Sequence, residues 1–134
     1  YVSLDELLTR SDFVTLHCAL TPETYQLIGR EELAKMKRSA VLVNAARGPV
    51  VDTEALTDAL REGVIWAAGL DVTDPEPIPA DHPLVHMSNV VIAPHIASAS
   101  FDTRNRMAVM AATNLLQALR GERPTHLVNP EVLG

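Results

Sequence analysis

Four short runs of apolar residues recur along the 134-residue chain, and polar or helix-like segments separate them. The runs cover residues 13–17, 40–44, 66–72 and 90–94. They are almost continuously hydrophobic and do not alternate with polar positions, which is typical of strands covered on both faces. The pattern therefore predicts a parallel sheet whose strands are joined by right-handed helical crossovers.

Start and stop signals bound two helices between these runs. Ser3 with Glu6 forms a capping-box pattern ahead of an apolar segment. Asp52 is a favourable N-cap for residues 53–62, and Gly63 follows that segment as a stop signal. These signals predict one helix before the first strand and another after the second.

Three further segments complete the predicted elements. Thr21 followed by Pro22 predicts a turn of helix after the first strand. Residues 73–83 are rich in proline and acidic side chains, which predicts a surface loop and not a strand. Residues 101–120 show a long helical pattern that ends at Gly121.

Composition and charge narrow the class of protein. With 47% hydrophobic and 21% charged residues, the chain is in the range of one soluble domain with a real core. The net charge of −6 is spread along the sequence, so we expect no nucleic-acid partner. No apolar run approaches the roughly 20 residues of a membrane span, and no cleavable signal opens the chain, so we expect a cytoplasmic protein without membrane contact. The single cysteine, Cys18, and the scattered histidines predict neither a disulfide nor a metal site.

Polar side chains with catalytic potential stand where the predicted strands end. Arg47 follows the second strand, Asp71 ends the third, Glu76 lies in the loop after it, and His95 follows the fourth. Ligands of open parallel sheets bind outside the carboxyl ends of the strands. We therefore expect these four groups to meet at one crevice.

The chemistry of these groups is complementary. Arg47 offers a planar fork of donors that suits a carboxylate. His95 can give or take a proton near neutrality, and Glu76, if it reaches the imidazole, would hold one tautomer and favour the protonated form. This set predicts proton transfer at a carbonyl or hydroxyl beside a carboxylate, with the hydride donor supplied by a cofactor.

Each residue also has a structural interpretation. Arg47 can be an exposed strand-end arginine, and Glu76 a solvated loop acid. His95 can be a core or edge histidine, Asp71 a turn cap, and Cys18 an inert buried thiol. The catalytic interpretation depends on their coincidence at the same edge of the sheet.

The chain resembles the D-isomer-specific 2-hydroxyacid dehydrogenases in four ordered stretches, LHCALTPETYQLIG, VNAARGPVVDTEALTDALREG, AAGLDVTDPEPIPADHPL and VVIAPHIASAS. Within that family, the GLDVTDPEP loop, the TRNRMA helix and the LVNPEVL tail are most similar to glyoxylate/hydroxypyruvate reductases. The resemblance implies that Arg47 binds the substrate carboxylate, that His95 is the acid/base, and that Glu76 pairs with it. The implied reaction is NAD(P)H-dependent reduction of a small 2-keto acid, glyoxylate or hydroxypyruvate, to the 2-hydroxy acid.

The resemblance also implies which residues lie along the cofactor, NAD or NADP. These are Cys18, Ala45, Ala46, Asp71, His95, Ala97 and Ser98. The family often has glycine where Ala97 stands, so a β-carbon there would narrow the approach to cofactor or substrate. The sequence contains no G-x-G-x-x-G turn, which would cradle the cofactor phosphates.

The expected architecture is therefore the second half of a Rossmann-type doubly wound parallel sheet plus a long C-terminal crossover helix. We expect residues 1–100 to form the C-terminal half of an NAD(P)-binding domain. Residues 101–134 would be a crossover helix and tail that return to a substrate domain absent from this sequence. The resemblance implies a homodimer, with the 134 residues inactive alone. A dinucleotide-regulated binding protein, similar to the C-terminal-binding corepressors, is the alternative because fold does not determine function.

Overall fold

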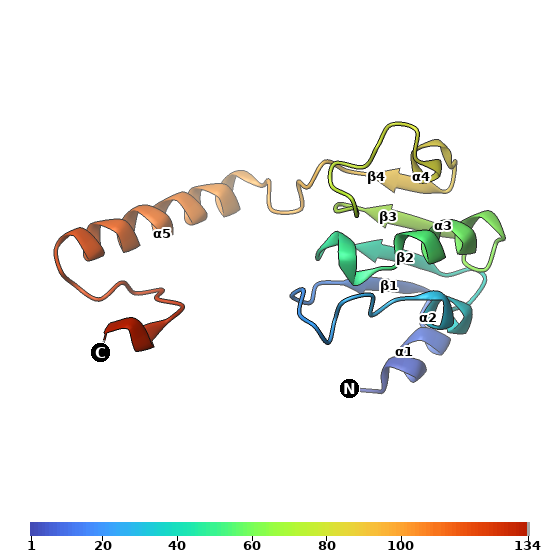
Figure 1. Ribbon diagram of the computed structural model, residues 1–134, viewed down its shortest axis with the longest axis horizontal. Helices are drawn as coiled ribbons and strands as arrows, with labels where there is room; N and C mark the ends of the chain where they lie inside the picture. The colour runs from blue at the N-terminus through green and yellow to red at the C-terminus, as the bar shows by residue number, and fades with distance from the viewer. Residues whose placement is uncertain (134) are drawn as a thin grey trace. The chain divides into compact units, whose positions relative to one another are not determined.

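The computed structural model describes residues 1–133 and contains a parallel sheet of four strands (Figure 1). The strands lie in the order β1-β2-β3-β4, and each pair of neighbours is parallel. Their bounds are Phe13–Leu16, Val41–Asn44, Ala67–Leu70 and Val90–Ile92. Each strand lies within the apolar run predicted for it, so the predicted parallel α/β sheet is confirmed. The chain divides into a unit over Tyr1–Ile96 and a second unit that begins at Ala97.

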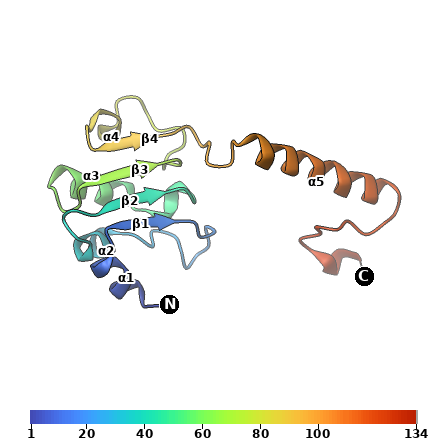
Figure 2. The same cartoon turned by 180° about the vertical axis from the view of Figure 1, so that it is seen from behind.

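The helices of the first unit cover one face of the sheet (Figures 1 and 2). The covered positions are the buried side chains Val14, Leu16, Leu42, Asn44, Ala68 and Leu70. The alternate positions belong to the other face, where Phe13 and Val91 are each 73% exposed. Trp66, just before β3, is 65% exposed and lines a shallow hollow on this face with Val41, Val43 and Val91. The prediction that the strands are covered on both faces is therefore not met within Tyr1–Ile96. The continuous apolar pattern arises because both faces are apolar, although only one is packed.

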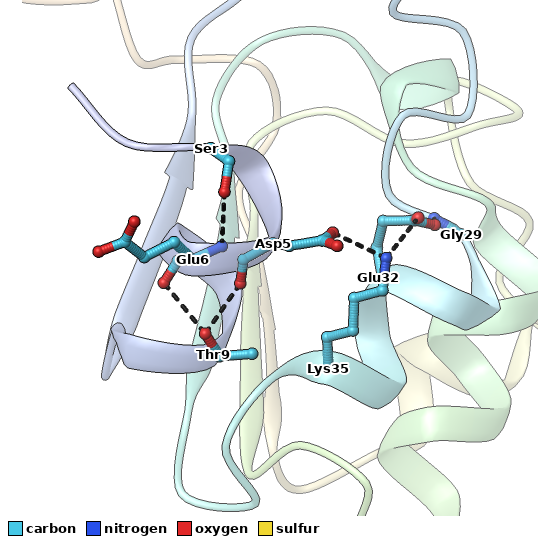
Figure 3. A network of polar contacts seen from close by, with 7 residues as sticks. All are labelled: Ser3, Asp5, Glu6, Thr9, Gly29, Glu32 and Lys35. Carbon is cyan, nitrogen blue, oxygen red and sulfur yellow. Dashed lines mark hydrogen bonds and ion pairs between the residues drawn. The ribbon is translucent and has the colours of Figure 1, made fainter.

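Helix α1 (Leu4–Arg10) is attached to α2 (Arg30–Lys35) by surface polar contacts (Figure 3). The Ser3 hydroxyl caps α1 by accepting a hydrogen bond from the backbone N–H of Glu6 at 3.2 Å, as its sequence pattern predicts. The Lys35 ammonium lies 2.8 Å from the Asp5 carboxylate and so joins the two helices. Leu8 on α1 and Leu33 on α2 are buried beneath these contacts.

The chain after Thr21 forms a single turn of helical type, in which the N–H groups of Thr24 and Tyr25 donate to the Thr21 carbonyl at 3.1 and 3.0 Å. The turn is not continued into a longer helix, and α2 begins only at Arg30. The Thr24 hydroxyl accepts a hydrogen bond from the Thr21 N–H at 2.8 Å and donates one to the Ala19 carbonyl at 2.7 Å. Gln26 then has a φ of 51°, in the left-handed region that ends a right-handed helix. The Thr-Pro pair thus predicts this turn correctly, the Thr24 hydroxyl reinforces it, and Gln26 ends it after one turn.

Helix α3 (Thr53–Arg61) has the predicted ends. The Asp52 carboxylate accepts a hydrogen bond from the Ala55 N–H at 3.0 Å, and Gly63 follows the helix with a φ of 67°. Leu56 and Leu60 are buried in the core that α3 shares with the sheet. The segment after β3 remains outside the sheet until the short helix α4 (Pro83–His86), as its proline content predicts.

The second unit contains α5 (Phe101–Leu119) and a 3-10 turn over Pro130–Leu133. The Ser100 hydroxyl caps α5 by accepting a hydrogen bond from the Thr103 N–H at 3.2 Å, and Gly121 follows the helix with a φ of 73°. No residue of α5 is buried. Among the described residues, no helix combines the length and apolar character needed to cross a bilayer.

Candidate active site at the strand ends

Two hollows lie at the carboxyl ends of the strands. The histidine hollow, of about 480 Å³, follows β3 and β4 and is lined by Asp71, Thr73, Glu76, Pro77, Ile78, Ile92, Ala93, Pro94 and His95. The arginine hollow, of about 510 Å³, follows β1 and β2 and is lined by His17, Cys18, Ala19, Leu20, Ala45, Ala46 and Arg47. Both volumes are in the range of small-ligand sites. Because the four strands are neighbours in one parallel sheet, the two hollows lie along the same edge.

Glu76 and His95 are in direct contact within the histidine hollow. The Oε1 atom of Glu76 lies 2.7 Å from Nδ1 of His95, which is the distance of a strong hydrogen bond. Their side chains are 41% and 47% exposed, so both remain open to solvent and to a ligand. With Nδ1 committed to the carboxylate, Nε2 is the ring nitrogen left to exchange a proton with a substrate.

The backbone of His95 has an unusual conformation that Asp71 helps to hold. His95 has a φ of 53°, in the left-handed region that non-glycine residues rarely occupy. Its N–H donates to the Asp71 carbonyl at 2.9 Å, and the N–H of Ile96 donates to the Asp71 carboxylate at 2.7 Å. Strained backbone of this kind is concentrated at functional sites, where the surrounding structure must maintain it. Asp71 thus anchors the turn that directs the imidazole.

Arg47 stands at the arginine hollow with its side chain exposed. Its Nη1 atom donates to the carbonyl of the adjacent Ala46 at 2.7 Å. Among residues 1–133, no carboxylate forms an ion pair with this guanidinium within 4.0 Å. A guanidinium in this state retains donors for an incoming anion.

The buried amide of Asn44 holds the turn that carries Arg47. Asn44 is the last residue of β2 and is 1% exposed. Its Oδ1 accepts a hydrogen bond from the Ala46 N–H at 3.0 Å, and its Nδ2 donates to the Arg47 carbonyl at 2.9 Å. The sequence interpretation did not include Asn44, although a polar residue at the end of an apolar run was a signal for it.

The structure thus groups most of the predicted site residues into two sets. Asp71, Glu76 and His95 share the histidine hollow, and Cys18, Ala45, Ala46 and Arg47 share the arginine hollow. Ala97 and Ser98 belong to the second unit. Among residues 1–133, no group of three or more His, Cys, Asp or Glu side chains is placed to hold a metal ion.

Comparison with known proteins gives consistent matches along the chain. Residues 1–97 match the model of the D-isomer specific 2-hydroxyacid dehydrogenase, NAD binding domain. A glyoxylate reductase of Korarchaeum cryptofilum is 59% identical over 99% of the chain, which corresponds to 40% of that protein. A glyoxylate/hydroxypyruvate reductase B of Yersinia pestis is 53% identical over 99% of the chain and 41% of its own length. The chain therefore spans about two fifths of the length of these relatives.

Solved structures agree with these relatives. The TT0316 protein of Thermus thermophilus superposes with a TM-score of 0.91 at 57% identity, covering 95% of this chain and 40% of that one. The NAD-complexed D-isomer specific 2-hydroxyacid dehydrogenase of Lactobacillus delbrueckii ssp. bulgaricus superposes with a TM-score of 0.88 at 39% identity, covering 96% and 43%. The likeness thus extends from the sequence to the fold.

Proposed function

Because this chain belongs to the D-isomer specific 2-hydroxyacid dehydrogenase family, we propose that it carries the acid/base residues of an enzyme that reduces a small 2-keto acid. The observation that carries the proposal is the 2.7 Å contact between Glu76 and His95 on the sheet edge that also presents Arg47. Glyoxylate and hydroxypyruvate are the proposed substrates, since the relatives at 53–59% identity are named for them.

Arg47 is the proposed carboxylate-binding group. Its guanidinium is exposed at the arginine hollow, and a bidentate pair with a carboxylate would fix the orientation of a 2-keto acid. The carbonyl next to that carboxylate is polarised when His95 donates a proton to its oxygen. Glu76 holds the imidazole by Nδ1, so Nε2 carries the proton that is transferred. Bound NAD(P)H supplies the hydride that reduces the 2-keto carbon.

The residues of the arginine hollow suit one end of a dinucleotide. Cys18, Ala45 and Ala46 line the hollow with small side chains, which lets a flat ring approach the strand ends. We propose that these residues, together with Asp71, His95, Ala97 and Ser98, lie along NAD or NADP. The G-x-G-x-x-G turn that would bind the pyrophosphate is not among these 134 residues, and we propose that another part of the full-length chain supplies it.

We further propose that residues 1–100 are the second half of the cofactor domain and that residues 101–134 return to a substrate domain. Two observations support this division. The uncovered sheet face exposes Phe13, Trp66 and Val91, and α5 exposes the apolar side chains Met107, Val109, Leu115 and Leu119. Apolar surfaces of this kind are normally covered in a complete protein. A cytoplasmic homodimer is the proposed assembly.

The test is oxidation of NADH or NADPH, followed by absorbance, on addition of glyoxylate or hydroxypyruvate. The 134-residue chain is measured beside the full-length natural chain, with Arg47→Ala and His95→Ala made in the latter. Arg38→Ala and His86→Ala are matched controls, because both wild-type side chains are exposed and lie outside the hollows. We expect turnover by the full-length chain that the first two variants lose and the controls retain. A folded full-length chain that binds dinucleotide without turnover would favour a binding protein instead.

A further inference from the structure

The loop that carries Arg47 is pressed directly against the loop that carries Glu76. Gly48 follows Arg47, is buried, and begins the 3-10 turn Gly48–Val50. A β-carbon at Gly48 would overlap the backbone carbonyl of Thr73 and lie 2.8 Å from the amide nitrogen of Asp74. Glycine is required here because the two backbones leave no room for a side chain.

A hydrogen bond beside this contact joins the start of α3, which follows the Arg47 loop, to the loop that carries Glu76. The Thr53 hydroxyl, on the first residue of α3, donates to the Asp74 carbonyl at 3.0 Å. The Thr73 hydroxyl donates to the Pro75 carbonyl at 2.9 Å, which restrains the loop two residues further along. We call Gly48, Thr53, Thr73 and Asp74 the loop clasp.

In the sequence, the loop clasp lies between Arg47 and Glu76. On one side it is adjacent to Arg47, whose turn is fixed by the buried Asn44 amide. On the other side it precedes Glu76 by two residues, at the start of the exposed stretch 74–77. The position from which Glu76 reaches His95 is therefore set by backbone held against the arginine loop.

We infer that the loop clasp is a positioning device that fixes Arg47 relative to the Glu76–His95 pair, an inference that rests on the proposed function. In a 2-keto acid the carboxylate and the carbonyl are on adjacent carbons. A substrate held by Arg47 is therefore reactive only if His95 lies at the correct offset. Misplacement by about 1 Å can lower a catalysed rate by about 100-fold. Thr53 and Gly48 act through Arg47 and Glu76 and need no contact with the substrate.

Thr53→Val in the full-length natural chain is the main test, because it removes the hydroxyl and keeps the β-branched shape. We expect kcat for hydroxypyruvate to fall about 3- to 10-fold while KM changes less than about twofold, since Arg47 still binds the carboxylate. Thr53→Ser should restore kcat.

Thr57→Val is the matched control. The Thr57 hydroxyl lies on the same helix and donates to the Thr53 carbonyl at 2.7 Å, so the substitution deletes a hydrogen bond within α3 and leaves the bond from the Thr53 hydroxyl to Asp74 in place. Its kcat should equal that of the wild type. Gly48→Ala forces the backbones of the Arg47 loop and of Thr73 apart. If circular dichroism shows that this variant keeps the native fold, its kcat should fall by about 100-fold.

The outcomes separate the clasp from the proposed function. Absence of turnover by the wild type would overturn the proposed function and, with it, the inference. Turnover by the wild type with an unchanged kcat in Thr53→Val would overturn the clasp alone. An equal loss in Thr57→Val, or no recovery in Thr53→Ser, would assign the effect to α3 in general and would also overturn it.

Discussion

The histidine hollow and the arginine hollow lie on the same sheet edge, yet they differ in how far their polar groups are already paired. In the first, the Glu76 carboxylate holds the imidazole at 2.7 Å, and apolar residues such as Ile78 and Ile92 line the walls. In the second, the Arg47 guanidinium donates to the carbonyl of its own neighbour, Ala46. The Glu76–His95 pair is thus oriented before a substrate binds, whereas Arg47 keeps hydrogen-bond donors available for one.

This difference matches what each side is proposed to do. A group that transfers a proton must be oriented before the substrate arrives, because reorganisation during the reaction raises the barrier. A group that binds a carboxylate must instead leave its donors unpaired until the anion replaces water. The comparison therefore predicts that substitutions in the histidine hollow lower kcat, whereas substitutions in the arginine hollow mainly raise KM for the keto acid.

The largest effect is expected on the histidine side from His95→Asn. Asparagine tolerates the positive φ of 53° at this position, so the turn is kept while the acid/base group is lost. We expect kcat of the full-length chain to fall by about 100- to 10,000-fold, with KM for the dinucleotide little changed. Steady-state kinetics with circular dichroism measure this. A rate near that of the wild type would show that His95 is not the acid.

On the arginine side, Arg47→Lys keeps the charge and removes the planar fork. We expect kcat/KM for the keto acid to fall by about 10- to 100-fold, mostly through KM, because a single ammonium cannot form the bidentate pair. The Arg38→Lys substitution is the control, since Arg38 is exposed and donates to the Gly63 carbonyl at 3.3 Å. A loss confined to kcat would contradict the assigned difference between the sides.

Asn44→Ala tests the support beneath the arginine hollow. The substitution leaves the Ala46 N–H and the Arg47 carbonyl without their buried partner. We expect the free energy of unfolding to fall by about 1–3 kcal/mol, measured by urea titration. The control, Asn105→Ala on the exposed surface of α5, should leave the free energy of unfolding nearly unchanged. If the two variants were equally stable, the Asn44 amide would have no special structural role.

The smallest effect concerns Asp58, which lies on α3 outside both hollows. The Arg30 guanidinium, 2.7 Å away, lowers the pKa of this carboxyl. A lowered folded-state pKa stabilises the protein above the ordinary value of about 3.9, and this contribution is lost as pH falls toward the folded-state pKa. Asp58→Asn should therefore reduce stability slightly at pH 7 and flatten its decline near pH 4, with kcat unchanged. Denaturation at several pH values would detect this, and a reduced kcat would contradict it.

Local signals predicted much of the fold. The four apolar runs contain the four strands, and the Asp52 and Ser3 caps begin helices where the sequence places them. The meeting of Glu76 with His95 was also predictable, because the carboxyl ends of parallel strands share one edge. These inferences needed only periodicity, cap residues and the geometry of a parallel sheet.

Other features depend on contacts that local patterns do not encode. The Thr-Pro turn does not extend into a longer helix because Gln26 adopts a left-handed φ of 51° and the Thr24 hydroxyl is bonded back to the Ala19 carbonyl. The contact of Gly48 with Thr73 joins residues 25 positions apart, and the hydrogen bond that the Ile96 N–H donates to the Asp71 carboxylate spans the same number. The apolar runs also gave no indication that one face of the sheet is uncovered within Tyr1–Ile96.

The uncovered sheet face and the open outer edge of β1 together affect how the purified 134-residue chain should be handled. Within the described residues β1 pairs with β2 alone, so its outer edge presents backbone donors and acceptors beside the exposed ring of Phe13. An open strand edge flanked by apolar side chains is a template on which another copy can add a strand. We therefore expect self-association to grow with protein concentration, and light scattering across a dilution series would reveal it.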